Sequence, residues 1–137
     1  MVTALLAVLA SVALPTGRFM LKRERESELR LYLRQMRTAI DDHKRLADQG
    51  MIQVELGTEG YPKALEDLVE GISMVGQQTK RKFLRRIPTD PMTGKTEWGQ
   101  RSYQDSSDST SWGGQNVYDV YSLSEGTALD GTKYKDW

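Results

Sequence analysis

The chain has 137 residues, enough for one domain, and its 19 basic and 19 acidic side chains give a formal net charge of zero. This balance argues against a nucleic-acid partner, because binding to the phosphate backbone needs a basic surface. The sequence contains no cysteine, which excludes disulfides, thiolate chemistry and cysteine-based zinc sites. Hydrophobic residues make up 38% of the chain, and much of this content lies in the first 50 residues. We therefore expect a thin core in the remainder that depends on the N-terminal segment.

The chain begins with an apolar run, residues 1–14, in which the only polar side chains are those of Thr3 and Ser11. This run is shorter than the roughly 20 residues that span a bilayer. It could be a signal peptide cleaved near Ala13, although no Lys or Arg precedes it. It could also be a buried core helix. We favour a membrane anchor that begins a few residues before Met1, although the charges after the run favour a cytoplasmic C-terminal side.

From Leu29 to Ala47 the apolar residues recur in steps of three and four, which predicts one stripe along a helix. If the helix runs from Met1 to about Ala47, it is roughly 70 Å long at 1.5 Å per residue. A small head cannot bury such a helix, so part of it must contact lipid or another subunit. Pro15 can kink the helix without ending it, and Gly50 is a plausible stop. The expected stripe consists of Leu29, Tyr32, Leu33, Met36, Ala39, Ile40, His43, Leu46 and Ala47.

The rest of the chain predicts one short helix and a few strands. Pro62 suits a first helical turn, so we expect a helix from Pro62 to about Glu70. Residues 71–82 are expected to be irregular and exposed. Alternating patterns predict strands at 98–103 and 115–123, and residues 133–137 could form a short closing strand.

These elements predict an α+β fold, in which a long N-terminal helix packs against a head with a small antiparallel sheet. A sheet of two or three short strands is not stable alone, so it needs the helix. We expect residues 1–28 to form the membrane-anchoring and filament-core half of the helix. Residues 29–137 would form the head, including the amphipathic half of the helix. Three tryptophans are expected to seal the core: Trp98, Trp112 and Trp137.

Three motifs resemble one protein family. Residues 1–15, MV-x-A-x-L-A-V-L-A-S-x-A-x-P, resemble the N-terminal helix of type IV pilins and type II secretion pseudopilins, with Pro15 at the family's helix-breaking proline. Residues 84–98, L-R-R-I-P-T-D-P-M-T-G-x-x-x-W, resemble the turn before the sheet in the major pseudopilins of type II secretion systems. Residues 117–137, V-Y-D-V-Y-S-L-S-E-G-T-A-L-D-G-T-x-Y-x-x-W, resemble that family's C-terminal strand and loop. The family's leader motif, a Gly followed by Phe and a Glu five residues into the mature chain, matches no position here.

The resemblance implies a structural subunit, not an enzyme. Such a subunit polymerises with copies of itself into a pseudopilus that helps to move folded proteins across the outer membrane. It implies a single-pass anchor in the bacterial inner membrane, a periplasmic head, and minor pseudopilins and an inner-membrane platform as partners. A type IV pilin of an adhesive or motility fibre is the close alternative, and a secreted monomeric binding module with a cleaved signal peptide is the distant one. The residues expected to carry assembly are Leu5, Leu6, Val8, Leu9, Val12, Leu14 and Pro15.

Several members of the family hold a calcium ion in the C-terminal loop, which implies a possible calcium site here. The donors would be the carbonyl of Leu123 and the side chains of Ser124, Glu125 and Asp130, since Ca²⁺ prefers oxygen ligands. The loop looks shorter than the calcium-binding version and lacks its second acidic residue. The alternative is an ordinary glycine-rich turn with Asp130 and Gly131 at its corner. Asp105 and Asp108 form a weaker cation candidate.

Two other features have plain structural interpretations. The basic cluster Lys80, Arg81, Lys82, Arg85 and Arg86 is either a solvated face or a docking surface for an acidic neighbour or for membrane headgroups. His43 is the only histidine, and its place on the apolar stripe favours a packed residue over a ligand. No nucleophile or acid stands at a recognisable spacing from it, and no phosphate-binding glycine loop is present. The sequence therefore predicts no catalytic site.

Overall fold

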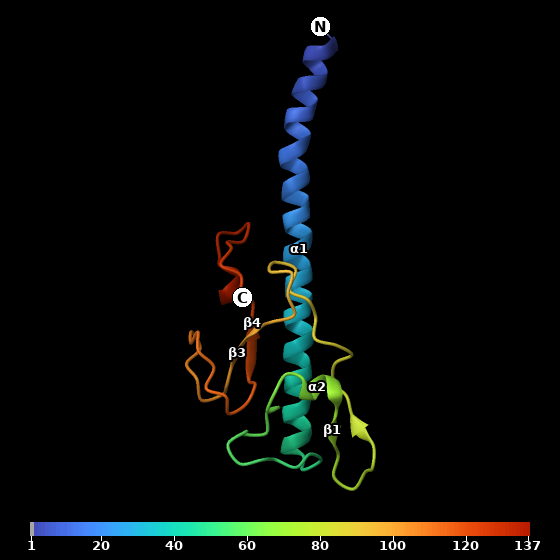
Figure 1. The fold of residues 1–137 in the computed structure, drawn as a ribbon, viewed down its shortest axis with the longest axis vertical. Coiled ribbons are helices and arrows are strands. Elements are labelled where there is room, and N and C mark those ends of the chain that lie inside the picture. Colours follow the sequence, from blue (N-terminus) through green and yellow to red (C-terminus); the bar gives the residue numbers. More distant parts are fainter. Residues whose placement is uncertain (1) are drawn as a thin grey trace.

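The structure is a computed structural model that describes the backbone of residues 2–137 and the side chains of residues 17–137 (Figure 1). The expected assembly residues Leu5, Leu6, Val8, Leu9, Val12, Leu14 and Pro15 lie outside the described side chains. The fold is α+β, as predicted: one long N-terminal helix carries a head with two small antiparallel sheets. Its elements are α1 (Val2–Asp48), α2 (Asp67–Glu70), β1 (Ile72–Ser73), β2 (Lys80–Arg81), β3 (Gly99–Arg101), β4 (Asp119–Tyr121) and the 3-10 helix η1 (Tyr134–Asp136).

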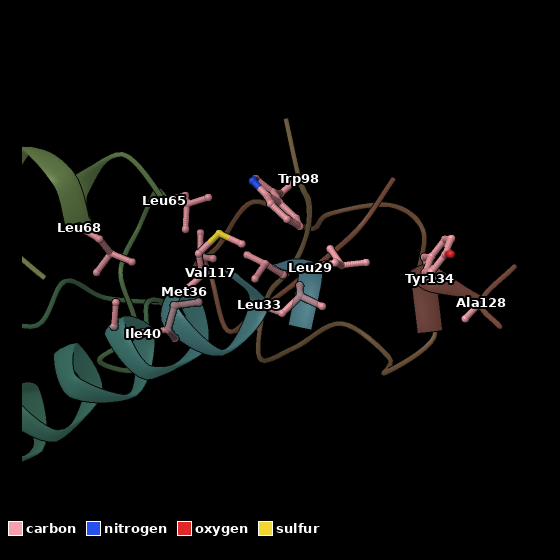
Figure 2. Close-up of a cluster of buried hydrophobic side chains, with 12 residues drawn as sticks. Leu29, Leu33, Met36, Ile40, Leu65, Leu68, Trp98, Val117, Ala128 and Tyr134 are labelled. Carbon is pink, nitrogen blue, oxygen red and sulfur yellow. The ribbon is translucent and has the colours of Figure 1, made fainter. Parts of the chain in front are cut away.

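The predicted apolar stripe of α1 is confirmed as the face that contacts the head. Leu29, Met36 and Ile40 are fully buried, and Leu33 is 2% exposed. Figure 2 shows these four side chains pointing toward residues of the head, among them Leu68 and Val117. After α1 ends at Asp48, Gly50 takes a positive φ of 73°, a conformation that glycine adopts without steric cost. The stripe and the helix end therefore follow from the sequence pattern.

The strands are shorter than predicted, and they form two sheets instead of one. β3 pairs with β4 in an antiparallel register, with Gly99 opposite Tyr121. A Cβ on Gly99 would lie 2.2 Å from the Tyr121 ring, so the ring occupies the space that any other side chain would need. β1 pairs with β2, and both lie in the segment 71–82 that we expected to be irregular. That expectation was wrong: the segment is polar and contains glycines, so its pattern gives no sign that two residues of each strand pair.

Two other sequence-based expectations need correction. The helix predicted from Pro62 forms only over α2, because the Pro62 carbonyl accepts a hydrogen bond from the Val117 amide at 2.7 Å, far along the chain. The expected closing strand 133–137 is the 3-10 helix η1. Its last amide, that of Trp137, donates to the Tyr134 carbonyl at 3.2 Å. At Pro62 the partner is distant in the sequence, whereas at the C-terminal end a local turn replaces the expected strand.

The main core lies between α1, α2 and the β3–β4 sheet. Trp98 is 5% exposed, and its indole N–H donates to the Pro88 carbonyl at 2.8 Å. Trp112 is 41% exposed, so the expectation that it seals the core was wrong. Trp137 is partly buried and packs against the core. The core cluster consists of Leu29, Leu33, Met36, Ala39, Ile40, Leu65, Leu68, Trp98, Val117, Val120, Ala128 and Tyr134.

The contact between α1 and the head can be tested with two leucines on one helix. Leu33→Ala should lower the free energy of unfolding by about 2–5 kcal/mol, because it leaves a cavity in the core. Leu31→Ala is the matched control: Leu31 is 46% exposed, so its loss should cost under about 1 kcal/mol. Urea unfolding followed by tryptophan fluorescence measures both. Equal losses for the two variants would contradict the packing described.

Candidate functional site

The N-terminal part of α1 leaves large apolar side chains uncovered. Phe19, Met20 and Leu21 are 52%, 62% and 56% exposed. Figure 1 shows why: the blue end of α1 extends well past the head. In the sequence these residues follow the apolar run 1–14 after the four residues 15–18. Within residues 17–137, no helix is long and apolar enough to cross a membrane.

A buried carboxylate joins α1 to the C-terminal segment. Glu26 is 9% exposed, and its Oε1 accepts hydrogen bonds from the Leu129 amide at 2.8 Å and from the Tyr134 hydroxyl at 2.7 Å. Burial, together with the hydrogen bond to Glu26, raises the pKa of Tyr134 well above its usual value. Glu26 and Arg30 stand four residues apart, a spacing that suits a surface ion pair on a helix, but the two are not paired here. The head offers Glu26 two donors, which a neighbouring arginine on the same helix cannot match.

Two arginines of α1 bind the C-terminal segment, one through hydrogen bonds and the other by stacking. The Arg37 guanidinium donates from Nε to Asp119 Oδ1 at 2.8 Å, and from Nη2 to the carbonyls of Val120 at 3.0 Å and Trp137 at 2.7 Å. Arg30 lies over the Trp137 ring, 3.9 Å from the ring centroid. Such contacts combine charge with planar stacking, which arginine does better than lysine. No signal in the sequence indicated these contacts, because they join residues that are 82 or more positions apart.

The expected calcium loop is a tight turn whose polar groups bind one another. Asp130 Oδ1 accepts from the Thr132 hydroxyl and, at 3.0 Å, from the Thr132 amide. These hydrogen bonds lower the pKa of Asp130. The Ser124 hydroxyl oxygen accepts from the Gly126 amide at 3.1 Å, and Glu125 lies 3.9 Å from the Lys135 ammonium.

Leu123, the fourth expected donor, has a side chain that is 47% exposed. Gly131 has a φ of 87°, consistent with a corner at Asp130 and Gly131. Among the described residues, no group of three or more His, Asp or Glu side chains is arranged to hold a metal ion. Calcium binding at this loop stays a prediction.

Asp105, the weaker cation candidate, stabilises a polar loop through hydrogen bonds to backbone amides. Its Oδ2 accepts from the amides of Ser102 and Gly113, both at 2.9 Å. These hydrogen bonds, that of Gly113 first, lower the pKa of Asp105. Asp108 is exposed in the same loop. The role visible for Asp105 is therefore structural.

The basic cluster is fully on the surface. Lys80, Arg81, Lys82, Arg85 and Arg86 are all exposed. The residues between them, Phe83 and Leu84, pack against the main core and fix the segment in place. This arrangement leaves both interpretations of the cluster open, a solvated face or a docking surface.

His43 is a packed residue at the far end of α1. It is 5% exposed, and its Nδ1 lies 2.9 Å from the Gly60 carbonyl oxygen. The Phe83 ring lies against it, with the ring centroids 5.6 Å apart. Burial lowers the pKa of His43 below its usual value. The imidazole therefore favours its neutral form, in which an Nδ1–H would donate to Gly60.

No protein-family model, no curated protein and no solved structure matches this chain. The class that the structure itself defines is an α+β protein with one long N-terminal helix and two small antiparallel sheets, an arrangement consistent with a pilin-like fold.

The hydrogen bond from the Tyr134 hydroxyl to Glu26 predicts that its removal lowers the stability of the fold. Tyr134→Phe removes the hydroxyl donor from a buried carboxylate and should lower the free energy of unfolding by about 1–3 kcal/mol. Tyr118→Phe is the control, because Tyr118 is 45% exposed and its ring remains in place. Thermal or urea unfolding of both variants measures the effect. If Tyr134→Phe were as stable as the control, the hydrogen bond would contribute nothing.

The buried histidine predicts a pH dependence with a definite sign. Because the folded state has the lower His43 pKa, the unfolded state binds the proton more readily below about pH 6.5. Stability should fall with falling pH there, by at most about 1.4 kcal/mol per pH unit. His43→Gln can still donate to Gly60 and should flatten the curve between about pH 5 and 7. Hydrogen bonds hold the pKa values of Asp105 and Asp130 below their usual range, so both carboxylates stay ionised here. An unchanged slope in the variant would contradict the assignment.

Proposed function

We propose that this protein is a structural filament subunit of the kind formed by the major pseudopilins of type II secretion systems. The observation that carries the proposal is the exposed apolar surface at Phe19, Met20 and Leu21, which follow the apolar run 1–14 closely in the sequence. The helix would anchor each copy in the bacterial inner membrane, with the head in the periplasm. Copies would then bundle through α1, and the heads would form the outer surface of the filament.

The division of α1 into two parts supports this proposal. From Glu26 to Ala47 the inward face of the helix is buried against the protein's own head. Before Glu26 the head offers little cover, and large apolar side chains stay exposed. Burying such a side chain fully is worth about 1.5–3 kcal/mol, so lipid or another copy of the helix would stabilise this part. One repeated contact between different faces of identical subunits builds an open helical filament.

The buried titratable groups support a structural role over an enzymatic one. Glu26 binds the C-terminal segment. Asp90, which is fully buried, accepts hydrogen bonds from the Met92 amide and the Ser122 hydroxyl. His43 faces a backbone carbonyl. Each group has an internal partner that accounts for its burial, so none of them needs a substrate to explain its position.

The alternatives differ in how the N-terminal segment is used. A type IV pilin would assemble through the same helix but into an extracellular fibre, and the minor pseudopilins and inner-membrane platform would not be its partners. A secreted monomeric module would lose the apolar run by cleavage near Ala13. Mass spectrometry of the mature N-terminus separates the module from the filament subunits. The calcium site at Leu123, Ser124, Glu125 and Asp130 is a separate proposal and is not needed for assembly.

The assembly proposal predicts a selective loss of self-association. The double variant Phe19→Glu/Met20→Glu should weaken self-association of the full chain by about tenfold or more, because charges would replace apolar contact area. Sedimentation in mild detergent and electron microscopy of membrane extracts measure the loss. The unfolding midpoint of the head should stay unchanged.

The control places the same charges on the head. Leu56 and Val75 are 105% and 62% exposed, so the double variant Leu56→Glu/Val75→Glu should assemble like the wild type. Wild-type assembly of the helix variant, or an equal loss in both variants, would contradict assembly through α1.

A further inference from the structure

Three basic residues of α1 lie on the same helix face as the buried stripe. Arg18, Lys22 and Arg25 precede Leu29 by eleven, seven and four residues, and these spacings return to one side of an α-helix. Where the stripe meets the main core, this face is apolar. Toward the N-terminus the same face becomes cationic while still facing the edge of the head.

A cleft of about 410 Å³ separates these cations from the head. Three basic residues, Arg18, Lys22 and Arg25, line it on the α1 side together with the apolar Leu21. Residues of the head, among them Met92, the loop 124–127 and Tyr134, line the other side. In Figure 1 the red C-terminal segment lies beside this part of α1. A volume of this size is typical of sites for small ligands.

The cations of the cleft have no acidic partner among residues 17–137. The ion pairs of this part of the chain involve other basic residues, such as Arg30 with Asp130 at 3.8 Å. Glu26, the carboxylate on the same side of the helix, already accepts hydrogen bonds from Tyr134 and Leu129. The cleft therefore presents positive charge and hydroxyl groups together, which is the chemistry that binds a phosphate.

We propose that this cleft binds the phosphate group of an anionic phospholipid. The inference rests on the proposed function, because it requires residues 1–14 to lie in the bilayer. At 1.5 Å per residue, Arg18 stands about 6 Å beyond Leu14 and Lys22 about 12 Å beyond it. The headgroup layer on each side of a bilayer is roughly 5–8 Å thick.

These heights place Arg18 in the headgroup layer and Lys22 just outside it. Helical side chains lean toward the helix N-terminus, and long basic chains extend toward the headgroups. Lys22 and Arg25 can therefore reach back toward the membrane. The bound lipid would bridge α1 and the loop 124–127, and it would hold the head upright at the membrane surface.

The test uses the full chain in lipid nanodiscs, with amide hydrogen exchange of residues 124–134 as the readout. In discs that contain phosphatidylglycerol, exchange should be about tenfold slower than in discs of phosphatidylcholine alone, since each basic residue near an anionic surface favours binding severalfold. Arg18→Gln/Lys22→Gln/Arg25→Gln should remove this difference. Arg18→Lys/Lys22→Arg/Arg25→Lys keeps the charge and should retain most of it.

The matched control removes the same charge from the basic cluster on the head. Lys80→Gln/Arg81→Gln/Lys82→Gln should keep the full dependence on phosphatidylglycerol, and an equal loss in this control would overturn a specific cleft. Equal protection by millimolar inorganic phosphate in neutral discs would overturn the lipid as the source. If slower exchange instead depended on the number of protein copies per disc, contacts between copies would explain it, and the proposal would again be overturned.

The two proposals fail in different ways. If the chain does not enter neutral discs at all, the membrane anchor and the proposed function fail. If it enters them, but exchange at residues 124–134 does not respond to phosphatidylglycerol, only the lipid site fails.

Discussion

The contact between the apolar stripe of α1 and the head holds this fold together. The strands of the head have only two or three residues each, and paired strands of this length are not stable in isolation. Leu33, Met36 and Ile40 supply the surface on which α2 and the β3–β4 sheet pack. Because the chain has no cysteine, no disulfide can replace this contact. The head therefore depends on the helix that the filament would also use.

The polar contacts of the C-terminal segment extend this dependence toward the N-terminal part of α1. Glu26 binds Tyr134 and the Leu129 amide, while Arg37 holds the carbonyl of Trp137. These contacts fix the loop 124–127 beside the N-terminal part of α1. The same helix face thus serves the core at one end and presents cations at the other. One helix, α1, therefore links the core of the head to the basic residues near its own N-terminus.

Helical periodicity predicted α1 well, because burial follows a 3.6-residue repeat that a single sequence displays. The resemblance of residues 84–98 also implied a turn before the sheet, and one lies at Asp90: its carboxylate accepts a hydrogen bond from the Met92 amide, and Gly94 has a φ of 72°. The strand lengths and the pairing of β1 with β2 were not predicted, because they depend on partners distant in sequence. No local pattern marks Glu26 as buried, and only the positions of Tyr134 and the Leu129 amide explain its burial. Long-range contacts of this kind leave no local pattern, so the cleft beside Arg18 was equally hidden.

The most direct measurement is the accessibility of one engineered thiol, which is unambiguous because the chain has no native cysteine. Met20→Cys places the thiol at a position that is 62% exposed in the single copy. Maleimide labelling should be fast for chains dispersed in detergent and at least about tenfold slower in assembled material, because the α1 helices would then cover one another. Ser107→Cys, in an exposed loop of the head, should label at the same rate in both states. Equal labelling of Met20→Cys in dispersed and assembled protein would contradict assembly through α1.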